Sequence, residues 1–111
     1  MSTNAPNPRL PGNIVLLKLR SGEEIIARQP EVSSDGELLH LTHVRVLHLI
    51  QDRNHRGPSV SLFPFLLGCT HPDVEIPVLR KDVMVDLTPH LNPGLERSYF
   101  ESTSGLALVS N

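Results

Sequence analysis

Apolar and polar residues alternate along residues 14–28 with the period of a β-strand. Val15, Leu17 and Leu19 share one side of the first half, and basic residues occupy the other side, as expected of a strand with one buried face. The pattern breaks at Gly22 and then resumes. Because glycine most readily adopts the positive φ of a tight reversal, the stretch predicts a β-hairpin that turns at Gly22.

Further strand-like segments follow the hairpin. Residues 37–51 are apolar on both faces, which predicts one long, strongly bent strand. Residues 59–68 are strongly apolar but contain Pro64, and proline cannot donate to a strand ladder, so we expect an edge strand or a bulge. Residues 74–79 and 83–87 read as two shorter strands. A bent hairpin followed by a long strand, a variable loop and two shorter strands is the layout of a small barrel, so we expect a mainly β domain, a small five-stranded open barrel.

A helix is predicted at the C-terminal end. Asn92 and Pro93 have the residue types of an N-cap and a first helical position, and Gly105 is a typical stop. The apolar stripe of this helix consists of Leu95, Tyr99 and Thr103, extended by Leu106. Since a short helix is marginal alone, we expect it to dock on the barrel or on a neighbour.

The composition fits one domain, because the chain has 111 residues. Residues 1–12 contain three prolines and two asparagines and are interpreted as a flexible arm, with a partner-binding arm as the alternative. We therefore divide the chain into an arm (1–12), a barrel (13–89) and a C-terminal helix with its tail (90–111).

The charge and the apolar content limit the function classes. A net charge of −2 argues against a strongly basic nucleic-acid binder, although one local basic loop suffices for phosphate contacts. Cys69 is the single cysteine, so no intramolecular disulfide forms. The N-terminal residues lack the apolar core of a signal peptide, and no apolar run approaches the ~20 residues of a membrane span. We expect a cytoplasmic protein with no membrane contact.

The hairpin motif resembles the opening of the Sm-like (Lsm) family, particularly its divergent phage-type members. The matching positions are Val15, Leu17, Leu19, Gly22, Ile25, Ile26 and Ala27. Three further pieces carry the phage-type resemblance: KLRSGEEIIA, SLFPFLLG, and the helix with its STSGLAL tail. The resemblance implies an SH3-type barrel, a homo-oligomeric ring of about five to seven subunits, binding of single-stranded RNA, and the host cytoplasm if the protein is phage-encoded.

The chain departs from the RNA-binding pattern of this family at three places. Thr42 and His43 stand where the family's loop between its second and third strands usually carries Asp and Asn. Arg80 matches the arginine of the family's Arg-Gly pair, but Lys81 replaces the glycine. The helix follows the barrel, whereas the family usually places it first.

The first candidate nucleic-acid site is the Arg80-Lys81 pair. In an Sm-like ring this loop lines the central pore, so the pair would form a positively charged ring that attracts phosphates. The alternative is a solvated turn whose charges balance Asp82.

Two further candidates are weaker. His43 has the chemistry to stack on a base, and the alternative is a partly buried, hydrogen-bonded histidine. Arg53, His55 and Arg56 form a basic loop able to touch a phosphate, and the alternative is a loop charged for solubility.

An apolar edge strand tends to recruit another chain, so we expect the fourth strand of one subunit to pair with the last strand of the next. The expected interface residues are Leu62, Phe63, Pro64, Phe65, Val83 and Val85.

Metal binding and catalysis are not expected. His40 and His48 lie roughly 26 Å apart in an extended strand, and Cys69 with His71 supplies only two ligands. No Gly-rich phosphate loop or nucleophile elbow is present. Two hypotheses remain: a ring that binds single-stranded RNA without a cofactor, and a ring-shaped structural or protein-interaction module that does not bind nucleic acid.

Overall fold

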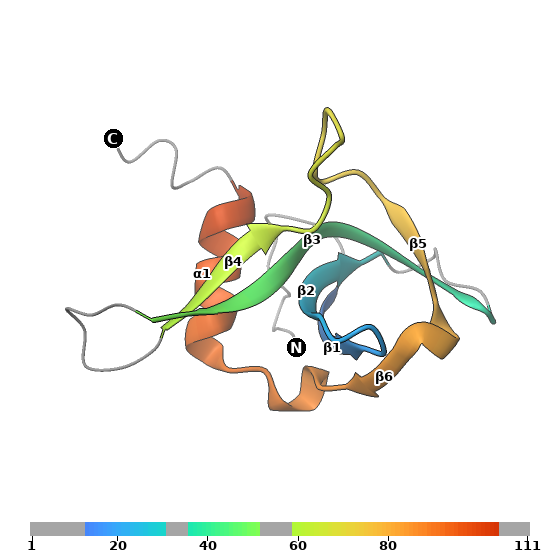
Figure 1. The fold of residues 1–111 in the computed structure, drawn as a ribbon, viewed down its shortest axis with the longest axis horizontal. Helices are drawn as coiled ribbons and strands as arrows, with labels where there is room; N and C mark the ends of the chain where they lie inside the picture. Colours follow the sequence, from blue (N-terminus) through green and yellow to red (C-terminus); the bar gives the residue numbers. More distant parts are fainter. Residues whose placement is uncertain (1–12, 31–35, 52–58, 105–111) are drawn as a thin grey trace, which may run out of the picture.

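The computed structural model describes residues 13–30, 36–51 and 59–104, and within them the fold is a sheet with one C-terminal helix (Figure 1). The strands are β1 (Asn13–Leu19), β2 (Glu24–Gln29), β3 (Leu38–Ile50), β4 (Ser59–Pro64), β5 (Ile76–Leu79) and β6 (Val83–Asp86). Two 3-10 turns, η1 (Arg80–Asp82) and η2 (Thr88–His90), precede the helix α1 (Pro93–Ser104). The predicted mainly β fold with a C-terminal helix is confirmed. The predicted count of five strands is wrong, because the sheet has six.

The strands are antiparallel in the order β4-β3-β2-β1-β6, with β5 paired to β3, and the sheet does not close into a barrel. The predicted hairpin is β1–β2, whose register runs from Asn13 opposite Gln29 to Lys18 opposite Glu24. Its turn places Gly22 at a φ of 112°, a conformation that side chains other than glycine rarely adopt.

The segments expected at 59–68 and 74–79 form β4 and β5, and both pair with β3, which changes its partner part-way along its length. Arg45 lies opposite Pro64 in β4, whereas Leu41 lies opposite Ile76 in β5. Residues 66–75 leave the sheet between these two ladders and project as a loop at the top of Figure 1. His43 stands at the changeover with a φ of 53°, so the backbone is locally irregular where β3 changes its partner.

The first of two apolar cores lies on the concave face of the curved sheet. Its buried members are Val15, Leu17, Leu19, Ile25, Ala27, Leu39, Leu41, Val44 and Val46. Phe65, Ile76, Val78 and Val83 pack against them. The period-2 prediction for β1 is therefore confirmed for its inward-facing side chains.

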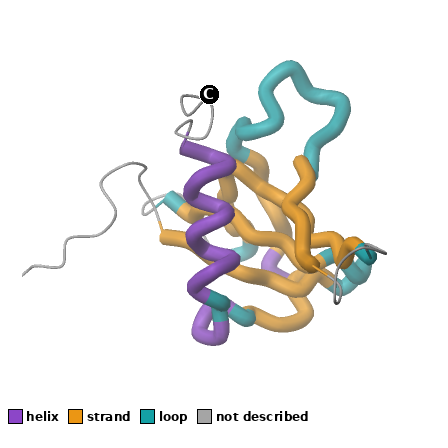
Figure 2. The backbone as a smooth tube through the Cα atoms, turned by 90° about the vertical axis from the view of Figure 1, so that its left-hand side faces the viewer, coloured by secondary structure: helices purple, strands orange, loops and turns teal. Residues whose placement is uncertain are grey.

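The second core lies between the opposite face of the sheet and α1, which crosses that face in Figure 2. Leu16, Ile26 and Tyr99 are buried here, and Leu95 packs against them. β1 is thus covered on both faces. Asn92 Oδ1 accepts the backbone N–H groups of Gly94 (2.7 Å) and Leu95 (3.2 Å), which confirms the predicted N-cap and the docking of α1.

Some sequence predictions fall outside the described residues: the arm at 1–12, the basic loop with Arg53, His55 and Arg56, and the tail that contains Gly105 and Leu106. In the part of the chain that is described, no helix has the length and apolar character needed to cross a membrane.

Candidate functional site

The candidate basic residues Arg80 and Lys81 lie exposed in η1, between β5 and β6. The β1–β2 turn is bonded to the same place: Arg20 N–H donates to Asp82 O (2.8 Å), and Arg20 Nε donates to Lys81 O (2.5 Å). Arg20, Arg80 and Lys81 therefore form one exposed group, called here the basic cluster.

Sequence reasoning missed Arg20, because its place beside η1 depends on the pairing of β1 with β6. That pairing sets Lys18 opposite Val85 and Leu19 opposite Val83, with a shift in register between them. Nothing in the local pattern around Arg20 predicts this register.

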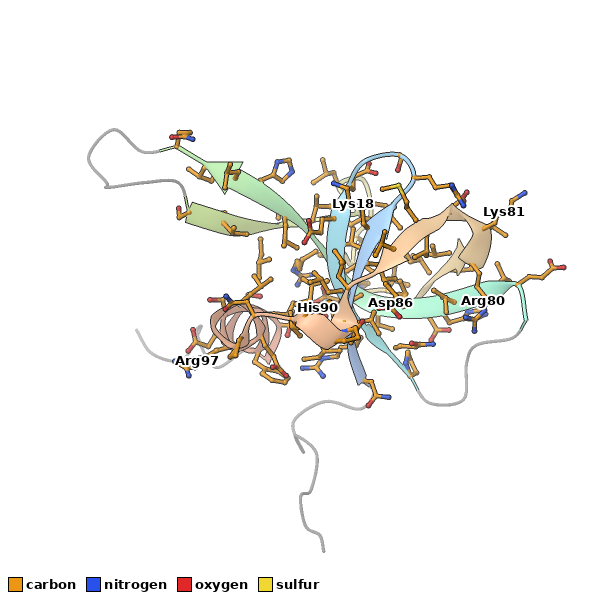
Figure 3. All side chains as sticks on the ribbon, turned by 90° about the horizontal axis from the view of Figure 1, so that it is seen from below. Lys18, Arg80, Lys81, Asp86, His90 and Arg97 are labelled. Carbon is orange, nitrogen blue, oxygen red and sulfur yellow. The ribbon has the colours of Figure 1, made fainter. Side chains whose placement is uncertain are left out.

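A cleft of about 340 Å³ opens next to the basic cluster, and we call it the Arg80 cleft. Val15, Leu17 and Leu39 of the first core line it, together with the polar side chains of Gln29, Arg80 and Asp86. Figure 3 shows Arg80 and Asp86 on the side of the molecule seen from below, and Lys81 projecting outward at the edge. The cleft combines an apolar lining with one cationic and one anionic side chain.

His43 does not belong to this group. Thr42 and His43 lie within β3, as the strand predicted over residues 37–51 implies, so their alignment with the family's loop between its second and third strands does not match the fold. That loop ends near Glu37, whose carbonyl accepts Arg80 N–H (2.9 Å). The six residue steps from Glu37 to His43 span roughly 20 Å along a strand. The fold therefore separates His43 from Arg80, which the sequence analysis had assigned to the same nucleic-acid site.

The His43 side chain is largely buried and has close partners. Its Nδ1 lies 3.1 Å from Thr42 Oγ1, and its Nε2 lies 3.9 Å from Asp73 Oδ2. Burial lowers the pKa of His43. The negative charge of Asp73 raises it, and the positive charges of Arg28 and Arg45 lower it further. These contacts match the hydrogen-bonded alternative that the sequence left open for His43.

A set of polar contacts around His43 holds the projecting loop and α1 to β3. Arg45 Nη1 lies 2.6 Å from Asp73 Oδ1, and Tyr99 OH donates to His43 O (2.6 Å). The buried Arg28 guanidinium lies 5.6 Å from the ring centre of Tyr99 and 5.0 Å from that of Phe100, within cation–π range. Burial raises the pKa of Tyr99. The contacts are those of a structural joint.

The predicted interface residues divide into exposed and packed ones. Phe63 and Val85 are each 43% exposed, and Pro64 is exposed too. The other three pack against the two cores: Leu62, Phe65 and Val83.

The end strands expose further apolar side chains that the sequence analysis did not select, Val60 on β4 and Met84 on β6. Within the described chain, β4 and β6 are the two ends of the strand order, so each has one edge without a strand partner. We call these the open edges.

Metal-ligating side chains do not gather anywhere in the described residues: no three His, Cys, Asp or Glu side chains lie close enough to hold an ion. His40 Nδ1 pairs with Glu75 Oε2 at 3.1 Å, and Cys69 is exposed. Comparison with known protein families finds none that matches the chain, and comparison with curated proteins finds no match either.

Proposed function

We propose that this protein is an Sm-like, SH3-type open barrel that assembles head to tail into a homo-oligomeric ring and binds single-stranded RNA through the basic cluster. The observation that carries the proposal is the pair of open edges, on β4 and β6, each with exposed apolar side chains. The strand order and the 3-10 turn between β5 and β6 support the small-barrel assignment.

The open edges explain why the chain would assemble. An apolar edge strand in water recruits another strand, and β4 pairing with the β6 of a neighbour is a heterologous contact that a ring can close. Phe65 N–H donates to Val44 O on β3 (3.2 Å). Because successive residues of a strand direct their N–H groups to opposite edges, the N–H groups of Val60 and Leu62 point toward the open edge of β4. Pro64, which has no N–H, also falls on that side.

The basic cluster would then repeat around the ring. η1 immediately precedes β6, so every subunit interface would have Arg80 and Lys81 beside it. Repeated cations attract a phosphate backbone, and arginine also stacks on bases. His43 is not included in this proposed site, because its side chain is directed to Asp73.

The second candidate function is a structural or protein-interaction ring that does not bind RNA. Asp82 lies inside the same 3-10 turn as the two cations, and the exposed Glu23 follows Arg20 in the neighbouring β1–β2 turn. Together with the net charge of −2, these acids favour a structural or protein-interaction ring over an RNA-binding one.

The test compares RNA binding by the wild type and by the double variant Arg80→Ala, Lys81→Ala. Fluorescence anisotropy with a labelled single-stranded RNA should show the affinity falling about tenfold or more and the salt dependence becoming shallower. Native mass spectrometry should show the same oligomer. Arg97→Ala, which removes an exposed charge from α1 far from Arg80 in Figure 3, is the matched control and should bind like the wild type.

Two outcomes would count against this assignment. A double variant that binds RNA as tightly as the wild type would show that the basic cluster is not the site. A wild-type oligomer that binds no RNA at all would leave the structural or protein-interaction ring as the better explanation.

A further inference from the structure

We propose that the Arg80 cleft holds one guanine base of the bound strand, with Asp86 accepting from its donor edge and Arg80 donating to its acceptor edge. This proposal rests on the RNA-binding function proposed above and adds base selectivity to it.

The cleft has the size and lining of a site for one flat ring system. Its volume of about 340 Å³ lies at the small end of ligand pockets, which span about 300–1,000 Å³. Val15, Leu17 and Leu39 line it with aliphatic carbon and belong to the concave core. The cleft reaches this core because the sheet does not close into a barrel. A base entering here would exchange water for apolar contact on its faces.

Asp86 is held in an orientation suited to recognition. It lies opposite Leu17 in the β1–β6 ladder, so the two side chains share the concave face. Its Oδ1 accepts the Thr88 backbone N–H (3.0 Å) and the Thr88 hydroxyl (2.6 Å). Because a carboxylate has about four lone-pair sites, these two bonds fix its orientation and leave capacity for a ligand.

The two charges of the cleft complement guanine better than the other bases. Guanine presents O6 and N7 as acceptors, which arginine binds with two hydrogen bonds, and next to them N1–H and the N2 amino group as donors, which suit a carboxylate. Adenine has an acceptor at N1, which would face the carboxylate of Asp86 unfavourably. Uracil and cytosine lack two adjacent donors on this edge.

The experiment measures selectivity among strands that differ in one base. Three labelled RNAs are compared by anisotropy: an oligouridine, the same strand with one central guanine, and the same strand with one central adenine. The wild type should bind the guanine strand about tenfold or more tightly than the adenine strand, as expected for one added bidentate pair. Replacing the guanine by inosine, which lacks the 2-amino group, should lose part of that gain without any change to the protein.

Asp86→Asn tests the residue itself, because its Oδ1 can still accept the two Thr88 bonds while the carboxylate charge is removed. The ratio of guanine to adenine affinity should fall toward one in Asp86→Asn and stay at the wild-type value in Glu101→Gln, which alters an exposed acid on α1.

Failure of this proposal is distinguishable from failure of RNA binding. Equal wild-type affinities for the three strands, an unchanged inosine strand, or full selectivity in a folded Asp86→Asn variant would overturn the guanine site while RNA binding stands. No binding to any strand would overturn both proposals.

Discussion

The hydrogen bond from Tyr99 to the His43 carbonyl provides a sharp test of the structural joint. Tyr99 is fully buried, and its hydroxyl lies 2.6 Å from a carbonyl at the irregular point of β3. Tyr99→Phe keeps the ring and its packing but leaves that carbonyl without its donor. A buried polar group deprived of its partner costs about 1–3 kcal/mol. Since 1 kcal/mol shifts the Tm of a domain of this size by roughly 4–8 °C, the loss should be easy to measure.

The assay is thermal and urea unfolding followed by far-UV circular dichroism at one fixed protein concentration, because assembly makes Tm concentration-dependent. Glu101→Gln on the exposed face of the same helix is the control and should stay within about 0.5 kcal/mol of the wild type. Tyr99→Ala, which also deletes the ring, should lose about 3–5 kcal/mol. A Tyr99→Phe variant as stable as Glu101→Gln would refute the contribution assigned to this bond.

Three further results are expected. Because the pKa of His43 is lowered in the folded protein, the imidazole is protonated more readily in the unfolded chain, so the free energy of unfolding should fall as the pH drops below about 6.5. In urea unfolding at pH 5 and pH 7, His43→Gln should reduce this loss of stability. The same pH dependence in the variant and the wild type would contradict the role of His43. Gly22→Ala should cost about 1–2 kcal/mol because φ is 112°, whereas exposed Gly68→Ala should stay within about 0.5 kcal/mol, and equal losses would contradict the turn assignment. Phe63→Asp should give folded monomers in size-exclusion chromatography, and elution at the wild-type volume would remove Phe63 from the interface.

The local elements of the fold were predictable because their signals are local. The β1–β2 hairpin follows from period-2 alternation around Gly22, and α1 follows from the Asn92 cap and a stripe that includes Tyr99. The two segments expected at 59–68 and 74–79 became β4 and β5, but the pairing of both with β3 was not predictable, because it depends on the positive φ of His43 and on the 66–75 loop. Hydrophobic periodicity does not report such a backbone irregularity.

The candidate site was predictable only in part. Arg80 and Lys81 stand out as adjacent cations between two strand-like runs, but Arg20 joins them through tertiary pairing. The burial of Arg28 between α1 and the sheet was also not predictable, because a basic residue at the end of a strand is normally exposed to solvent. The expected interface was also predictable only in part. Leu62 and Phe65 were expected at the subunit interface, but they pack against the two cores, so a charge at either position would disturb a core.

Native mass spectrometry of the freshly purified protein, with the absorbance ratio at 260 and 280 nm recorded alongside, tests the central claim most directly. The chain has one Tyr and no Trp, so even a small amount of bound nucleic acid would dominate that ratio. Pairing of the open edges predicts a single closed oligomer, with a raised ratio if RNA is bound. The resemblance to Sm-like proteins implies about five to seven subunits. A monomer at micromolar concentration would contradict the assembly through β4 and β6, and with it the proposal that repeats the basic cluster around a ring.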